Sequence, residues 1–176
     1  ARVWRRRQTR ALVISPTREL VVQIHDNVKA YAKHLPLKVA TVYGGVGEGP
    51  QKQALLNGYE LVIATPGRLM DLMDQGCADF SGLEYLVLDE ADRMLDMGFL
   101  PNIRRIVKDL PKKGRQTLLF SATLSRPIEK LTKEFQFKPR KVEIGRRSNP
   151  ADTVQQIIHE VPKPKKIHLL KHLLPV

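Results

Sequence analysis

The segment Tyr85-Leu86-Val87-Leu88-Asp89-Glu90-Ala91-Asp92 is an apolar run that ends in carboxylates. A short unbroken apolar run is typical of a strand that is buried on both faces, as in a parallel sheet. In open α/β sheets, ligands bind at the carboxyl ends of the strands. We therefore expect Asp89 and Glu90 to lie at the mouth of a site and to be held there by a rigid strand.

The two adjacent carboxylates suggest metal-assisted chemistry. Asp89 is suited to hold Mg²⁺ through its water shell, because Mg²⁺ takes few carboxylates and keeps most of its waters. Glu90 is suited to orient or deprotonate an attacking water. An apolar strand followed by Asp-Glu is the Walker B arrangement of nucleoside triphosphatases. The alternative is structural, since acidic residues also favour the first turn of a helix.

The composition limits the class of protein. The chain has 176 residues, enough for one domain and little more. Its 30 Lys and Arg against 18 Asp and Glu give a net charge of +12, which suggests a polyanionic partner. An aromatic content of 6% favours contacts to phosphates over stacking on bases. The single cysteine, Cys77, excludes an internal disulfide and favours a reducing compartment, so we expect a cytoplasmic location. No apolar run approaches the roughly 20 residues of a membrane span, so we expect no membrane association.

Strand and helix patterns alternate along the chain, which predicts an α/β fold with a mainly parallel sheet flanked by helices. Helical spacing from Leu20 to Leu35 predicts one buried helix face that includes Tyr31. The same spacing predicts a helix over 102–110 with Ile103, Ile106, Val107 and Leu110 inward, and a further helix marked by Ile128, Leu131 and Phe135. The strands are expected in the apolar segments 11–14, 39–43, 61–64, 85–88, 117–120 and 142–144.

Two turns between a strand and a helix share one design, in Ser15-Pro16-Thr17-Arg18 and in Thr65-Pro66-Gly67-Arg68. Ser15 and Thr65 are expected to cap their helices, with Pro16 and Pro66 at the first helical positions. The start of a helix offers free amides and the positive end of a dipole, which favours anions. Both turns should face the same edge of the sheet, where their arginines would add charge.

The glycine-rich segment 44–50 does not fit a phosphate-binding P-loop. Such a loop requires Gly-Lys followed by Ser or Thr, whereas Gly49 is followed here by Pro50 and Gln51. Two interpretations remain: a flexible turn whose amides approach a ligand closely, or a plain turn.

The hydroxyls of Ser121 and Thr123 follow another predicted strand, near the expected place of Asp92. A hydrogen bond to Asp92 would link the carboxylate site to its surroundings, and a helix cap is the alternative. Further along, the polar segment 145–153 is a candidate linker, followed by a predicted strand over 154–161 and a predicted helix over 167–174. The predicted organisation is one domain over 1–144, the linker, and the start of another domain over 154–176.

Five motifs in order resemble those of DEAD-box RNA helicases. They are Pro16-Thr17-Arg18-Glu19-Leu20, Gly44-Gly45, Thr65-Pro66-Gly67-Arg68, Asp89-Glu90-Ala91-Asp92 and Ser121-Ala122-Thr123. The resemblance covers the chain from Ala11 to about Ile158, and it implies a RecA-like fold with ATP and Mg²⁺ as cofactors and RNA as partner. Such enzymes couple ATP hydrolysis to the unwinding or remodelling of RNA, with little readout of base sequence.

The resemblance also implies roles for individual residues. Asp89 would hold Mg²⁺ and Glu90 would position the water that attacks the γ-phosphate. Asp92 would contact Ser121 and Thr123, in the Ser121-Ala122-Thr123 motif, and so join hydrolysis to strand separation. The RNA backbone would be lined by Pro16, Thr17, Arg18, Gly44, Gly45, Thr65, Pro66, Gly67 and Arg68.

Several parts of the family pattern are not found in this sequence. Nothing in residues 1–10 supplies the P-loop or the adenine-reading glutamine motif, and the arginine fingers of the second domain are missing. We therefore expect a fragment: an N-terminally incomplete first RecA-like domain, a linker and the start of a second domain. Two alternatives stay open: an RNA-binding module without ATPase activity, because the P-loop is missing, and a relative that acts on DNA.

Overall fold

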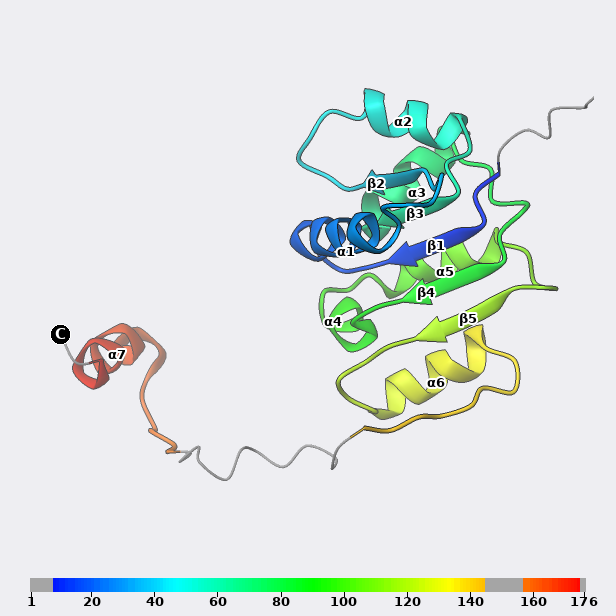
Figure 1. Ribbon diagram of the computed structural model, residues 1–176. Helices are drawn as coiled ribbons and strands as arrows, with labels where there is room; N and C mark the ends of the chain where they lie inside the picture. The colour runs from blue at the N-terminus through cyan, green and yellow to red at the C-terminus, as the bar shows by residue number, and fades with distance from the viewer. Residues whose placement is uncertain (1–7, 145–156, 175–176) are drawn as a thin grey trace, which may run out of the picture. The chain divides into compact units, whose positions relative to one another are not determined.

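The fold was analysed in a computed structural model, which describes residues 8–144 and 157–174. A five-stranded sheet forms its centre, in the order β2-β3-β1-β4-β5, and every neighbouring pair is parallel (Figure 1). The predicted α/β class with a parallel sheet is therefore confirmed. The strands are β1 (Ala11–Ile14), β2 (Val39–Val42), β3 (Leu61–Ala64), β4 (Tyr85–Leu88) and β5 (Gln116–Leu119).

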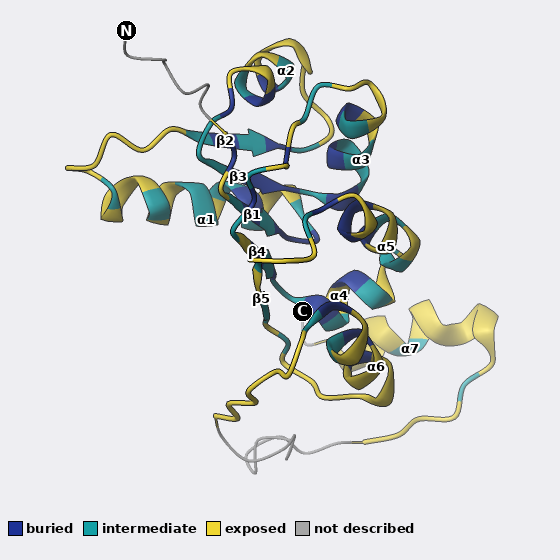
Figure 2. Ribbon diagram, turned by 90° about the vertical axis from the view of Figure 1, so that its right-hand side faces the viewer, coloured by how far each residue is buried: buried dark blue, intermediate teal, exposed yellow. Residues whose placement is uncertain are grey.

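Helices follow the strands and cover both faces of the sheet. Figure 2 shows α1 on one face and α3 and α5 on the other. Two ion pairs join neighbouring helices: Arg105 pairs with Asp74, and Arg104 binds Glu134 through two of its nitrogens. The helices are α1 (Arg18–Tyr31), α2 (Gly49–Leu56), α3 (Pro66–Asp74), α4 (Ala91–Asp96), α5 (Leu100–Lys108) and α6 (Arg126–Phe135).

The core lies between the inner strands and the apolar faces of the helices. β3, β1 and β4 are the inner strands, because each has a paired strand on both sides, and β3 is the best buried of the three. The predicted inward face of α5 is confirmed, as Ile103, Ile106 and Val107 are all buried. α6 buries Ile128, Leu131 and Phe135 at the same helical spacing.

The buried face predicted for α1 is too long. Val21 is fully buried, but Tyr31 is 85% exposed and Leu35, beyond the helix, is 65% exposed. The reason is a mismatch in length. A helix of 14 residues spans about 21 Å. A strand of 4 residues spans about 13 Å. The last turn of α1 therefore extends past the sheet that it packs on.

Two further strand predictions were wrong in detail. β5 covers Gln116–Leu119 and not 117–120, and because it is an edge strand of the described sheet, its Leu118 and Leu119 are only half buried. Residues 142–144 form no strand, and Val142 and Ile144 are 83% and 95% exposed. An apolar triplet alone does not make a strand, because its backbone groups need a neighbouring strand with which to pair.

The chain divides into two compact units, Ala1–Val142 and Glu143–Val176. In the second unit, a short 3-10 helix, η1 (Lys163–Lys165), leads into α7 (Lys166–Leu173), so the predicted C-terminal helix is confirmed. The predicted strand over 154–161 is not regular in its described part, 157–161, and the predicted linker 145–153 lies outside the described residues. Among the described helices, none is long and apolar enough to cross a membrane.

Candidate functional site

The motif residues meet at one rim of the sheet because the strands end in register. Val42, Ala64, Ile14, Leu88 and Leu119 occupy equivalent positions across the five strands. The hydrogen-bond ladder continues one residue beyond four of the five strands: the amides of Thr65, Ser15, Asp89 and Phe120 donate to carbonyls of the neighbouring strands at 2.8–2.9 Å. The predicted convergence of the turns on one edge is thus confirmed.

The first of the two similar turns departs from its prediction. Ser15 does not cap α1. Its amide donates to Ala64 O at 2.9 Å and so extends the strand ladder, and the helix begins only at Arg18. The cap is Thr17, which has extended backbone angles and whose Oγ1 accepts a hydrogen bond from Leu20 N at 3.3 Å. Pro16 is buried and precedes the helix, and Arg18 is the first helical residue. The prolines of the two turns therefore occupy different positions.

In the second turn the predicted positions are confirmed, but the Thr65 side chain makes no capping hydrogen bond. Thr65 is the extended residue before α3, and Pro66 is the first residue of the helix. The Thr65 carbonyl accepts the first bond of the helix, from Leu69 N at 3.1 Å. Gly67 and Arg68 lie in the first turn, so the half-buried Arg68 side chain starts beside the free amides of the helix.

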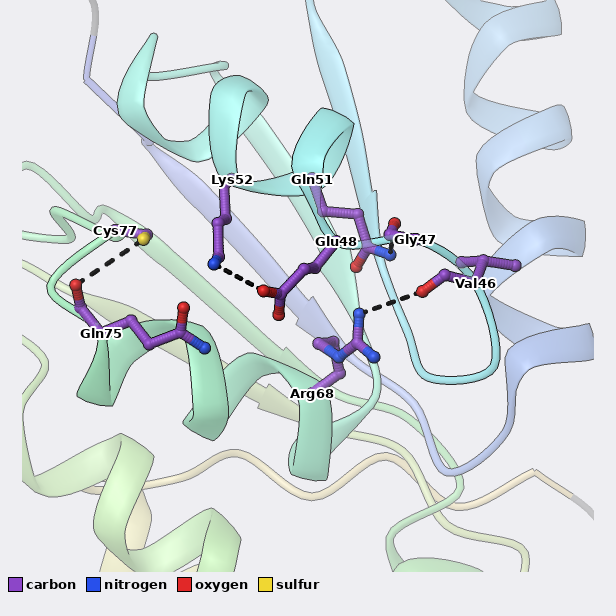
Figure 3. Close-up of polar contacts among 8 residues, drawn as sticks. All are labelled: Val46, Gly47, Glu48, Gln51, Lys52, Arg68, Gln75 and Cys77. Atoms are coloured by element: carbon purple, nitrogen blue, oxygen red, sulfur yellow. Dashed lines mark hydrogen bonds and ion pairs between the residues drawn. The ribbon is translucent and has the colours of Figure 1, made fainter.

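Arg18 and Arg68 lie against the turn that carries Gly44 and Gly45, although the three segments lie far apart in the sequence. The Arg18 Cζ atom lies 5.2 Å from the centroid of the Tyr43 ring. Gly45 has a φ of +81°, and a Cβ placed there would lie 3.8 Å from Arg18 Nη1. From the other side, Arg68 Nη1 donates to Val46 O at 3.3 Å (Figure 3). The glycine turn thus lies between two arginines from α1 and α3.

Asp89 is half buried directly after β4. Its Oδ1 accepts a hydrogen bond from Glu90 N at 3.0 Å. Burial raises the pKa of Asp89, and the neighbouring Glu90 charge acts in the same direction, while the Glu90 amide acts against them. The described residues contain no group of three or more metal-ligating side chains. The adjacent carboxylates of Asp89 and Glu90 fit Mg²⁺, which is held by one or two carboxylates together with waters and substrate phosphates.

Glu90 has a left-handed backbone conformation, with φ 49° and ψ 52°. This region is uncommon for residues other than Gly, and strained backbone is concentrated at functional sites. The Glu90 carboxylate points to its own helix, where Arg93 Nη1 donates to Oε2 at 3.0 Å. Its position between β4 and α4 places it at the rim beside Asp89.

Asp92 joins α4 to the loop after β5, as predicted. Its Oδ2 accepts a hydrogen bond from Thr123 N at 2.9 Å, and Ser121 Oγ donates to Thr123 O at 2.8 Å. Burial opposes ionisation of Asp92, but hydrogen bonds from Thr123, from the Arg93 amide and from Ser121 together lower its pKa. Ala122 lies exposed between the two hydroxyl residues.

Sequence reasoning missed three residues of this rim: Tyr43, Gln51 and Arg93. Tyr43 ends the second predicted strand and carries the ring on which Arg18 lies. Arg93 follows the carboxylates directly and pairs with Glu90. Gln51 follows Pro50 at the start of α2 and is 7% exposed. The feature that distinguishes Gln51 is its burial near a helix start, and burial is not visible in a sequence.

Comparisons with known proteins bear directly on this arrangement. The sequence profile of the DEAD/DEAH box helicases matches residues 2–131. DEAD-box ATP-dependent RNA helicase 20 of Arabidopsis thaliana is 45% identical over 164 residues, 93% of this chain and 32% of that protein. ATP-dependent RNA helicase RhlB of Pseudomonas aeruginosa is 44% identical over 95% of this chain and 43% of that protein.

The fold is similar to that of a solved structure as well. The crystal structure of a DEAD box protein from the hyperthermophile Methanococcus jannaschii matches with a TM-score of 0.70 and 37% identity. The match covers 74% of this chain and 36% of that one, which confirms the expected RecA-like fold. The chain spans about a third of the length of the Arabidopsis relative. By its profile match and by its fold, the chain belongs to the DEAD/DEAH box helicase family.

Proposed function

We propose that this chain supplies the RNA-backbone-binding surface and the hydrolytic carboxylates of an ATP-dependent RNA helicase. The observation that carries the proposal is the shared rim, where Arg18, Arg68 and the glycine turn lie at one end and Asp89, Glu90 and Asp92 follow β4. The Arabidopsis and Pseudomonas relatives are both named ATP-dependent RNA helicases, which supports the same activity.

The carboxylates divide the hydrolytic work between them. Asp89 would hold Mg²⁺ of a bound Mg²⁺–ATP, which supplies charge neutralisation on the phosphates. Glu90 would orient the attacking water, and release from Arg93 would free its carboxylate for that task. Asp92, through Thr123 N, would transmit a movement of α4 to the loop after β5, so that hydrolysis and RNA separation are coupled.

RNA would be bound along the other end of the rim by its phosphates. The exposed Arg18 guanidinium lies over the Tyr43 ring, and the exposed glycine turn is next to it at Gly45. Pro16, Thr17, Thr65, Pro66 and Gly67 build the helix starts that carry free amides toward the same edge. Phosphate contacts carry no base information, so binding would be sequence-tolerant. A cytoplasmic location, and a second RecA-like domain beginning at 154–176, are parts of the same proposal.

Titration of the chain with fluorescent single-stranded RNA tests the RNA surface. We expect Arg18→Ala to weaken binding several-fold and to reduce the slope of log affinity against log salt by about 0.7, the value for one phosphate contact. Arg104→Ala removes the same charge from an arginine that pairs with Glu134, and should leave the slope unchanged. Equal effects of both variants would show diffuse attraction by net charge and overturn the RNA surface.

ATP turnover is tested in the full-length protein, with and without RNA. Glu90→Gln should abolish RNA-stimulated turnover while RNA binding persists. No Gly-Lys-Ser/Thr loop occurs in residues 1–176, so we expect this chain alone to bind RNA without turnover. Turnover by the full-length Glu90→Gln variant at the wild-type rate would contradict the role of Glu90.

A further inference from the structure

Gln51 is a buried polar side chain beside the glycine turn, Gly44–Gly47. Among the described residues, its three hydrogen bonds all go to backbone groups, of Tyr43 just before the turn and of Gly47 at its end. Gln51 is 7% exposed. Its Oε1 accepts a hydrogen bond from Tyr43 N at 3.1 Å, and its Nε2 donates to Tyr43 O at 3.2 Å and to Gly47 O at 3.1 Å. A buried amide side chain is costly unless its groups are paired. Here it is paired entirely with one loop, which it closes at both ends.

The glycine turn itself has little packing that could hold it. Every residue from Gly44 to Pro50 is exposed, and a Cβ placed on Gly44 or Gly47 would meet no atom within 4 Å. Three glycines in four residues give the free chain many conformations. Hydrogen bonds therefore hold the turn: Gln51 binds Gly47 O and anchors the preceding residue Tyr43 through two bonds, and Arg68 binds Val46 O.

Contacts from α3 fix the outer side of the turn. Arg68 donates to Val46 O, and Figure 3 shows this contact beside the Lys52–Glu48 pair and Gln51. Lys52 Nζ lies 2.6 Å from Glu48 Oε1, and this hydrogen bond lowers the pKa of Glu48, with Gln75 contributing in the same direction. Gln51 therefore holds the turn from inside the fold and Arg68 holds it from outside, while the Lys52–Glu48 pair joins the first turn of α2 to its cap residue.

We propose that Gln51 is a positioning residue for RNA: it holds the Gly44–Gly47 turn in one conformation, so that its amides and the flanking Arg18 and Arg68 meet successive phosphates. The inference rests on the proposed binding of the RNA backbone at this rim. An ordered loop loses less conformational entropy when it binds than a mobile one. A turn released from Gln51 would have to be ordered again by each RNA that binds.

The test compares Gln51→Met with Gln53→Met in the chain as it stands. Met has a similar size but forms none of the three hydrogen bonds. Gln53 is exposed on the same helix, and its amide contacts Asn57. We expect Gln51→Met to weaken binding of a 12-nucleotide mixed-sequence RNA by about five- to tenfold, because the RNA must then order the released turn. Gln53→Met should bind as the wild type does.

Two further readouts separate positioning from a general loss of structure. The salt slope of binding should fall by about 0.7 for each phosphate that the protein no longer neutralises, and amide hydrogen exchange should accelerate at Gly44 and Gly45 but not in β1 or β4. Gln51→Asn keeps the amide on a shorter side chain and serves if the Met variant does not fold. Wild-type affinity and slope in the folded Gln51 variants would overturn this inference alone. A wild-type chain that binds no RNA would overturn the proposed function as well.

Discussion

Asp92 accepts a hydrogen bond from the backbone amide of Thr123 at 2.9 Å, across 31 residues of sequence. The bond connects the first turn of α4 with the loop that follows β5, and Ser121 keeps that loop folded by donating to Thr123 O. The helix that follows the β4 carboxylates and the hydroxyl motif are therefore directly connected. Hydrogen bonds from Thr123 and Ser121 to the Asp92 carboxylate make this connection.

Replacement of Asp92 should loosen this connection without unfolding the domain. We expect Asp92→Ala to lower the free energy of unfolding by about 1 kcal/mol, because the bonds that it removes are charge-assisted but partly exposed to solvent. Amide exchange at Thr123 should accelerate. Asp96→Ala, at the end of the same helix, is the control. Unchanged exchange at Thr123 in Asp92→Ala would contradict the connection.

The connection should also respond to acid. The pKa of Asp92 is lowered in the fold, so its stabilising contribution is present above the unfolded value of about 3.9. The contribution is lost as the pH falls through the lower, folded-state pKa. Protection of the Thr123 amide should therefore persist at pH 5 and decline only below about pH 4. A decline centred near pH 6 would point to another group.

Asp89 should destabilise the domain at neutral pH. Because burial raises its pKa, the folded state binds the proton more tightly than the unfolded state does, and stability falls as the pH rises through the interval between the two values. Asp89→Asn removes the buried charge and keeps an acceptor for Glu90 N. We expect a higher melting temperature at pH 7 and a difference that shrinks below about pH 3.9. Asp71→Asn, at an exposed position of α3, should change neither.

The left-handed conformation of Glu90 predicts an unusual order of stability among its variants. Gly adopts φ near 49° without strain, whereas Ala carries the cost of about 1 kcal/mol that L residues have in this region. Both variants lack the ion pair with Arg93, so their difference isolates the backbone. We expect Glu90→Gly to be more stable than Glu90→Ala in urea unfolding. At Gln53, inside α2, the order should be reversed, since Gly is the poorer helix former.

Two buried hydroxyls should respond in opposite ways to their removal. Ser15 is fully buried, and its Oγ finds no hydrogen-bond partner among the described residues. Thr9 is 1% exposed, and its Oγ1 donates to Tyr59 O at 2.9 Å. We expect Ser15→Ala to raise the free energy of unfolding by up to about 1 kcal/mol and Thr9→Val to lower it by about 1 kcal/mol. Calorimetry on both variants decides, and a loss of stability in Ser15→Ala would show that its hydroxyl is paired.

The Arg18–Tyr43 contact should contribute to RNA affinity through the ring face. Tyr43→Phe keeps that face and should bind RNA nearly as the wild type does. Tyr43→Leu removes it, and we expect affinity to fall by about two- to fivefold, which corresponds to the roughly 0.5–1 kcal/mol of an exposed cation–π contact. Anisotropy titrations at one fixed salt concentration give the comparison. Equal loss in both variants would assign the effect to the Tyr43 hydroxyl instead.

The sequence identified the elements and the chemistry because these are local. Apolar runs marked the strands of the sheet, and helical spacing marked α5 and α6, since each pattern reflects the period of one element. The Asp89-Glu90 pair and the two proline turns were visible for the same reason. Where the prediction was wrong, the decisive partner was distant in sequence. Ser15 was expected to cap α1, but its amide pairs with Ala64 O of another strand, so the strand ladder extends to Ser15 and the helix begins later.

What the sequence determined by itself is the order of strands and helices, their parallel class and the residue types available at each turn. Only the tertiary structure decided which of these residues touch. The register of the parallel strands brings the glycine turn, both arginines and the carboxylates to one rim, and the packing of α2 against β2 places Gln51 inside the fold. The physical reason is that pairing and burial are fixed by contacts between segments far apart in the chain, whereas a sequence pattern records only the preferences of each segment.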